Sequence, residues 1–208
     1  MTKLLHVSAS PRGATSASLA LAEAFTDRHR AANPDVVLDH VDLFEGTLPA
    51  FGRLAAEAKM SVFAGGQPTP QQTGEWDTAK AVYDRFAAAD AYLFSVPMWN
   101  AGVPYVLKQR IDLTTQPGWT FTFTPTDGYT GNVHGKTAAV VYTSGVYSPG
   151  APLALGNDSP STFFNDCLRF VGIDDVTEIR WQPNVLTASP EEDRVAAIGR
   201  AADPGSRV

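Results

Sequence analysis

The residues best suited to chemistry form a hydroxyl-rich turn close to the start of the chain. Residues 8–18 read SASPRGATSAS, between the short apolar run 4–7 and the Ala- and Leu-rich stretch 19–25. This order predicts a strand, a turn and a helix, which together make one βα unit. The turn would therefore lie at a helix N-terminus, where backbone N–H groups lack partners and the helix dipole is positive. Such a position attracts a phosphate group.

The side chains of this turn strengthen the case for a phosphate. Ser10, Thr15, Ser16 and Ser18 offer hydroxyl groups, and Arg12 offers a positive charge. A helix cap would account for Ser16 alone, since serine commonly caps helices. Four hydroxyl groups and an arginine exceed what a cap requires, so the composition of the turn favours phosphate binding.

The kind of phosphate ligand follows from what the turn lacks and what it contains. Neither G-x-G-x-x-G nor G-x-x-x-x-G-K-[ST] is present, which disfavours a dinucleotide-binding Rossmann site and a P-loop. A turn with one glycine and many hydroxyl groups suits a terminal monophosphate, because one dianion needs several donors around it. FMN carries such a group.

Length and composition narrow the class of protein. The 208 residues predict a single domain, 1–208, and the net charge of −6 argues against nucleic-acid binding. No apolar run reaches the length of a membrane span, and the N-terminus has no apolar region followed by a cleavage site. The single cysteine fits a reducing compartment. We therefore expect a cytoplasmic protein that binds neither nucleic acid nor a membrane.

Residue types that often carry catalysis form no constellation in the sequence. The four histidines have no metal-ligand spacing, and there is no G-x-S-x-G motif. Cys167 stands in an apolar helical pattern, which favours a small core residue over a nucleophile. The sequence predicts no metal site and no catalytic acid or base.

Periodicity predicts strands and helices in alternation. Apolar runs predict five strands, at residues 4–7, 36–43, 91–96, 138–143 and 176–181. Helical patterns occur at residues 19–25, 54–63, 74–89, 105–113, 161–171 and from 189 onward. Ser161 with Thr162, and Ser189, are expected to cap the last two helices. Residues 119–124 predict an exposed strand or half of a hairpin, and residues 128–135 predict a loop.

Five strands with helices between them indicate a doubly wound α/β fold with a parallel sheet. Ligands of such folds bind beyond the carboxyl ends of the strands. Three loops of unusual composition fall at that edge, namely residues 8–18, 97–104 and 144–150. The sequence therefore predicts one site that the three loops share.

Several stretches resemble the FMN-dependent NADH:azoreductase family, which is close to the NAD(P)H quinone reductases of flavodoxin-like fold. Residues 8–12 and 16–18 are similar to the family's phosphate loop. The segment PMWNAGVP at residues 97–104 resembles its P-M-[YW]-N-x-x-[IV]-P pattern, and residues 118–121 and 135–136 match in order. The resemblance implies a five-stranded parallel sheet in the order 2-1-3-4-5 with helices on both faces.

The resemblance also implies a cofactor, its donor and its site. FMN would be bound, NADH or NADPH would donate electrons, and a quinone or an aromatic azo compound would accept them. The residues expected to bind FMN are Ser10, Arg12, Ser16, Ala17, Ser18, Pro97, Met98, Trp99, Asn100, Ala101, Ser144, Gly145, Val146 and Tyr147. Plain core residues are the less favoured alternative for Met98 and Trp99, and the resemblance weakens that alternative further.

One loop departs from the family pattern. Where the family commonly has S-R-G-G, residues 144–147 read SGVY, so an arginine is missing and the glycine is shifted. Phe121 and Phe163 fall where the family places aromatic side chains in a substrate pocket shared between two subunits. The resemblance therefore implies a homodimer, although the residues alone also allow Phe121 to lie on a packed hairpin face.

The implied reaction is a ping-pong transfer of hydride and electrons through the flavin, in which the nicotinamide leaves before a flat acceptor takes its place. Two other functions fit the same fold. A flavodoxin-type electron carrier would bind FMN without turning over NADH, and a binding module would use the fold without a flavin. The added aromatic segments and modest acidity argue against the carrier, and the hydroxyl-rich turn argues against the module.

Overall fold

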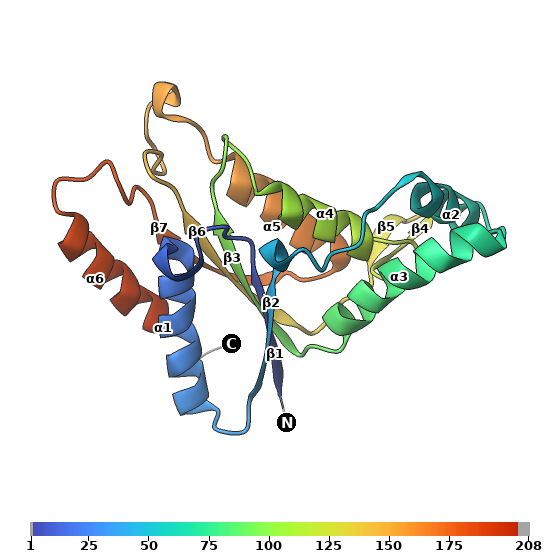
Figure 1. Cartoon of the computed structure of the whole chain (residues 1–208), viewed down its shortest axis with the longest axis horizontal. Helices are drawn as coiled ribbons and strands as arrows, with labels where there is room; N and C mark the ends of the chain where they lie inside the picture. The colour runs from blue at the N-terminus through green and yellow to red at the C-terminus, as the bar shows by residue number, and fades with distance from the viewer. Residues whose placement is uncertain (1, 204–208) are drawn as a thin grey trace.

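The computed structural model describes residues 2–203, which form a doubly wound α/β fold (Figure 1). The central sheet contains β1 (Lys3–Ser8), β2 (Val37–Asp42), β3 (Ala91–Pro97), β6 (Thr137–Thr143) and β7 (Asp175–Trp181). Within the described residues these five strands are all parallel and follow the order β2-β1-β3-β6-β7. Counted among themselves, they have the order 2-1-3-4-5. The predicted fold class and strand order are confirmed.

Helices cover both faces of this sheet (Figure 1). They are α1 (Ala17–Ala32), α3 (Pro70–Ala87), α4 (Tyr105–Thr114), α5 (Ser159–Val171) and α6 (Pro190–Ala202). The remaining helix, α2 (Arg53–Phe63), packs against α3 at one end of the molecule (Figure 1). On the face of α1 and α6, Phe25 and Ala197 pack with Leu93 of β3. On the face of α3, α4 and α5, Phe86 and Leu107 join a second buried cluster. The sheet therefore separates two apolar layers.

Burial on both faces explains the composition of the central strands. In β3, residues 91–96 are all buried, as expected for a strand in the middle of a parallel sheet. The edge strands β2 and β7 have several exposed residues.

No helix within residues 2–203 is both long enough and apolar enough to cross a membrane.

Helix boundaries differ from the predicted ones where capping and burial extend them. Helix α1 runs to Ala32, well past residue 25, because Phe25 and His29 keep its buried face continuous. Helix α3 begins at Pro70, where Thr69 and Gln72 form a reciprocal capping box. Residues 70–73, which lie before the predicted start of this helix at residue 74, are therefore helical.

The predicted cap of α5 is wrong, and that of α6 is right in position but lacks the side-chain hydrogen bond. Helix α5 begins at Ser159, and the N-cap residue Asp158 makes no capping bond through its side chain. Ser161 lies inside the first turn, where its Oγ instead accepts a hydrogen bond from Arg180 Nη2 at 2.8 Å. Ser189 occupies the N-cap position of α6, but its side chain makes no capping bond.

A two-stranded antiparallel hairpin lies outside the main sheet, next to α2 and α3 at one end of the molecule (Figure 1). It consists of β4 (Phe121–Thr124) and β5 (Gly128–Gly131), which pair in register. The hairpin confirms the strand expected at residues 119–124. The loop predicted at residues 128–135 is wrong in its first part. Backbone pairing with β4 makes a short strand of residues 128–131, although a glycine stands at each end of it.

The backbone of the hairpin at Gly131 lies directly against the backbone at the end of α5. A Cβ atom on Gly131 would lie 2.3 Å from the backbone nitrogen of Gly172, which follows α5 and has φ +101°. Next to this contact, Val133 N donates a hydrogen bond to Val171 O at 2.8 Å. The docking of the hairpin therefore requires a residue without a side chain at position 131.

We expect Gly131→Ala to lower the free energy of unfolding by about 2–3 kcal/mol, because the new methyl group meets backbone atoms that cannot rotate away. Urea unfolding measures the change. Gly74→Ala in α3 is the matched control, since its Cβ would meet nothing within 4 Å, and it should stabilise the protein by about 0.5–1 kcal/mol. Wild-type stability of the Gly131 variant would contradict the close contact.

Candidate functional site

A cavity of about 200 Å³ opens at the carboxyl edge of the sheet, where β1, β3 and β6 end. Its lining residues are Ser10, Arg12, Ser16, Ala17, Pro97, Met98, Trp99, Thr143, Ser144, Gly145, Asn184 and Val185. All three loops expected at this edge contribute to the lining. The structure thus brings most of the residues expected at the FMN site into one place.

The first wall of the cavity is the turn between β1 and α1. Ser16 Oγ accepts a hydrogen bond from Leu19 N at 3.3 Å and so caps α1, while Ser16 also lines the cavity. The first turn of α1 contains no acidic residue, so no side chain there offsets the positive end of the helix dipole. Capping and ligand binding are therefore compatible roles for the same serine.

The hydroxyl groups of this turn differ in their access to the cavity. Ser10 and Ser16 line it, whereas Ser18 is fully buried, with its Oγ 3.1 Å from Ser16 Oγ. The Thr15 hydroxyl donates to Arg12 O at 2.9 Å. Among the described residues that line the cavity, Arg12 is the only charged one. Positive potential here comes from Arg12 and from the N-terminus of α1.

The second wall is a tight turn after β3. Trp99 N donates to Gly102 O and Gly102 N donates to Trp99 O, both at 2.9 Å. Between them, Asn100 and Ala101 have φ values of +49° and +62°. Positive φ at both central residues is the signature of a type I′ turn, and it costs an alanine roughly 1 kcal/mol. The turn's own hydrogen bonds do not use the N–H groups of Asn100 and Ala101.

The third wall joins the loop after β6 to the loop after β7. Ser144 Oγ donates to Tyr147 O at 2.5 Å, which closes the SGVY segment on itself. Asn184 N donates to Ser144 O at 2.8 Å, and Val185 N donates to Gly145 O at 2.9 Å. The loop after β7 therefore extends the cavity beyond the segment expected from the sequence.

Three lining residues escaped the sequence analysis. Thr143 is the last residue of β6, and Asn184 and Val185 follow β7. The rule that ligands bind beyond the carboxyl ends of strands applies to β7 as well as to β1, β3 and β6. Applied to the last strand, the rule would have identified Asn184 and Val185.

A shallow apolar groove of about 400 Å³ lies beside the cavity and shares Trp99 with it. Pro11, Phe44 and Tyr105 form its other main surfaces, and the rings of Phe44 and Tyr105 meet edge to face at 5.9 Å. No charged residue is among the described residues that line the groove. Trp99 is 45 % exposed and stands between the two depressions.

Two titratable groups of interest are held in their neutral forms. Burial, together with neighbouring His40, lowers the pKa of His6 to about 3, and His6 Nε2 lies 2.9 Å from Ser95 Oγ. Burial raises the pKa of the Cys167 thiol to about 11, and Cys167 packs against the core. The thiol is therefore protonated at neutral pH and a poor nucleophile, as the sequence predicts.

Comparison with known proteins agrees with this geometry. Residues 2–203 match a family described as having a flavodoxin-like fold. The chain is 45% identical over 204 residues to an FMN-dependent NADH:quinone oxidoreductase of Ruegeria pomeroyi, covering 97% of this chain and 100% of that protein. A protein of the same description from Desulfotalea psychrophila is 36% identical, with 96% and 93% covered.

This chain belongs to the FMN-dependent NADH:quinone oxidoreductase family. The crystal structure of an azoreductase from Bacillus anthracis is also similar, with a TM-score of 0.90, 26% identity and full coverage of both chains. The family and enzyme class expected from the sequence are confirmed.

The two aromatic residues expected at the family's substrate pocket lie away from the cavity within one chain. Phe121 is 4 % exposed and packs against Tyr129 and Phe170, with ring centroids 5.7 and 5.2 Å away. Phe163 lies on α5 and is 36 % exposed. Their role in a pocket shared between two subunits stays a prediction.

Replacing Ala101 by glycine should raise the free energy of unfolding by about 1 kcal/mol, because glycine adopts φ +62° without steric cost. The variant also creates the Asn-Gly pair that type I′ turns favour. Thermal or urea unfolding measures the gain. Ala81→Gly, at an exposed position inside α3, is the control and should cost about 1 kcal/mol. Equal losses at both positions would show that the turn carries no strain.

Proposed function

We propose that the protein binds FMN in the cavity at the carboxyl edge and transfers electrons from NADH, or from NADPH, to quinones and aromatic azo compounds. The observation that carries this proposal is the convergence of three walls on one cavity: a capped helix N-terminus with an arginine, a strained aromatic turn and a loop of small residues. The names of the relatives, FMN-dependent NADH:quinone oxidoreductase and azoreductase, support it. The charge and the single cysteine support a cytoplasmic location.

The donors at the first wall fit a terminal phosphate. Ser10 and Ser16 offer hydroxyl groups to the cavity, and the first turn of α1 offers the N–H groups of Ala17 and Ser18. Arg12 supplies a positive charge that is exposed and therefore able to move toward a dianion. These groups would hold the phosphate, while Ser18 would support it from behind through Ser16.

The other two walls fit a flat ring with a polar edge. Met98 and Trp99 would contact the ring, and backbone N–H groups of residues 100–101 and 145–147 would face its heteroatoms. When bound, FMN supplies the chemistry, accepting a hydride and passing two electrons onward. The protein supplies position and excludes water, and no side chain is assigned as an acid or base.

The groove beside the cavity fits a neutral flat acceptor. Pro11, Phe44, Trp99 and Tyr105 give it apolar and aromatic surfaces, which bind flat rings by stacking. An acceptor that entered there would lie against the same tryptophan that borders the flavin. Quinones and azo compounds have this shape and polarity.

A homodimer also belongs to this proposal. Large apolar side chains are exposed on α2 and on the hairpin, namely Met60, Phe63, Phe123 and Tyr129. Three of these rings gather, with Phe123 centred 6.2 Å from Phe63 and 4.9 Å from Tyr129. Exposed apolar clusters of this kind are typical of surfaces that a partner covers. In such a dimer, Phe121 and Phe163 of one copy would contribute to a substrate pocket that the two subunits share.

Absorption spectroscopy of the purified protein with FMN, followed by anaerobic NADH, tests the function. We expect bound flavin that bleaches with NADH or NADPH, and parallel double-reciprocal plots when NADH and a quinone are varied. Bound flavin that neither donor bleaches would favour the electron carrier. Absence of binding at micromolar FMN would favour the binding module and overturn the proposal. Sedimentation equilibrium of the same sample should give twice the chain mass.

Arg12→Met should weaken FMN binding about tenfold or more, because the variant loses a charge-assisted contact to the phosphate. Riboflavin, which lacks the phosphate, should bind wild type and variant equally. Fluorescence titration with both flavins measures the two dissociation constants. Arg28→Met, on an exposed position of α1, is the matched control and should change neither. Equal loss for FMN and riboflavin would place Arg12 away from the phosphate.

A further inference from the structure

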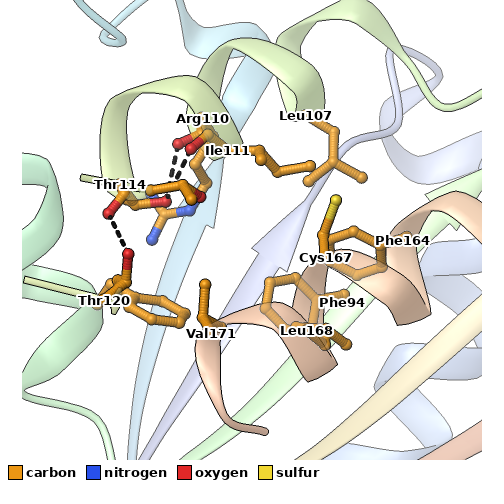
Figure 2. A pocket seen from close by; sticks show the side chains of 12 residues that line it. Phe94, Leu107, Arg110, Ile111, Thr114, Thr120, Phe164, Cys167, Leu168 and Val171 are labelled. Carbon is orange, nitrogen blue, oxygen red and sulfur yellow. Dashed lines mark hydrogen bonds between the residues drawn. The ribbon is translucent and has the colours of Figure 1, made fainter. Parts of the chain in front are cut away.

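A second, smaller cavity lies on the other side of the sheet from α1, between α4, α5 and the base of the hairpin (Figure 2). Its volume is about 30 Å³, and most of its surface is apolar, including Phe94, Leu107 and Phe164. It shares no lining residue with the cavity assigned to FMN. Whatever occupies it is therefore separate from the cofactor.

One strongly polar group enters this apolar space. Arg110 is 4 % exposed, and its Nη2 is buried without a hydrogen-bond partner within the described residues. Figure 2 shows its side chain passing from α4 into the space between Thr114 and Thr120. Both threonine hydroxyls donate to backbone carbonyls, Thr114 to Arg110 O at 3.0 Å and Thr120 to Thr114 O at 3.2 Å. Their protons are thus already engaged.

The guanidinium of Arg110 also forms no salt bridge within the part of the chain that the structure describes. Burial, with the neighbouring charge of Arg85, lowers the pKa of Arg110 to about 10, so the group is still positive at neutral pH. The carboxylate that favours its charge is Asp39, and this carboxylate is bound by Lys3 at 2.9 Å and by Arg85 at 2.5 Å. Among the described residues that line the cavity, Arg110 is the only charged one.

We propose that this cavity binds one small monovalent anion of about the size of chloride, held by the guanidinium of Arg110. A buried charge persists in an apolar interior when it is paired, and no side chain of residues 2–203 forms an ion pair with Arg110. The cavity volume of about 30 Å³ suits a small occupant and is far too little for a flavin.

A water molecule is the rival occupant. A water molecule in the cavity would give Arg110 Nη2 a hydrogen-bond partner but would leave the charge of the guanidinium uncompensated. An anion compensates the charge, so the two occupants differ in their response to halide concentration.

The test is the melting temperature in sodium chloride and in sodium gluconate at matched ionic strength. Gluconate is too large for the cavity. In chloride, the melting temperature should rise by about 3–6 °C for each tenfold increase above the dissociation constant. Arg110→Met should abolish the difference between the two salts, whereas Arg28→Met, at an exposed position, should retain it. General salt effects cancel when the change in melting temperature of one variant is subtracted from that of the other.

Crystals grown in sodium bromide provide a second readout that needs no variant. We expect an anomalous peak in contact with the Arg110 guanidinium. A cavity that holds only water in bromide, or a chloride effect that is the same in wild type and Arg110→Met, would overturn the proposal. Both readouts use the protein without added FMN or NADH, so the anion site and the proposed reductase function stand or fall separately.

Discussion

The arrangement of the site depends on the burial of a parallel sheet on both faces. Because β1, β3 and β6 run in the same direction between two apolar layers, polar groups are concentrated where the strands end. The hydrogen-bond ladder then continues past the strands. Ala9 N donates to Ser95 O at 3.0 Å, and Met98 N donates to Thr143 O at 2.7 Å. The three walls of the cavity are thus extensions of one sheet and are fixed relative to one another.

This continuity explains how a strained turn persists at the rim. Ala101 holds a left-handed backbone conformation that the residue itself disfavours. The cost is met by neighbours on both sides, since Met98 is tied to β6 and Gly102 is paired with Trp99. A turn held in this way presents the backbone N–H groups of Asn100 and Ala101, and the side chain of Trp99, without rearrangement. The turn therefore loses little conformational entropy when a ligand binds to those groups.

The sequence was sufficient for features that local chemistry determines. The hydroxyl-rich turn, the buried strand at residues 91–96 and the PMWN segment predicted the fold and most of the cavity lining. Features that depend on distant contacts escaped it. Asn184 reaches the cavity through a bond to Ser144, and β5 exists because β4 pairs with it and Gly172 admits Gly131. Neither relation leaves a periodic signal, because the first joins segments that are far apart in the sequence and the second involves a strand of only four residues with a glycine at each end.

Two arginines illustrate how environment decides what the same side chain can do. Arg12 is exposed at the rim of the larger cavity, where water stabilises its charge and where the proposed phosphate would approach it. Arg110 lies in an apolar interior, where desolvation is costly and each unpaired N–H group adds to that cost. An apolar residue of similar volume would commonly be at least as stable at such a position. The presence of a guanidinium there is best explained by an occupant that compensates its charge, which is why the small cavity and the buried arginine belong to one site.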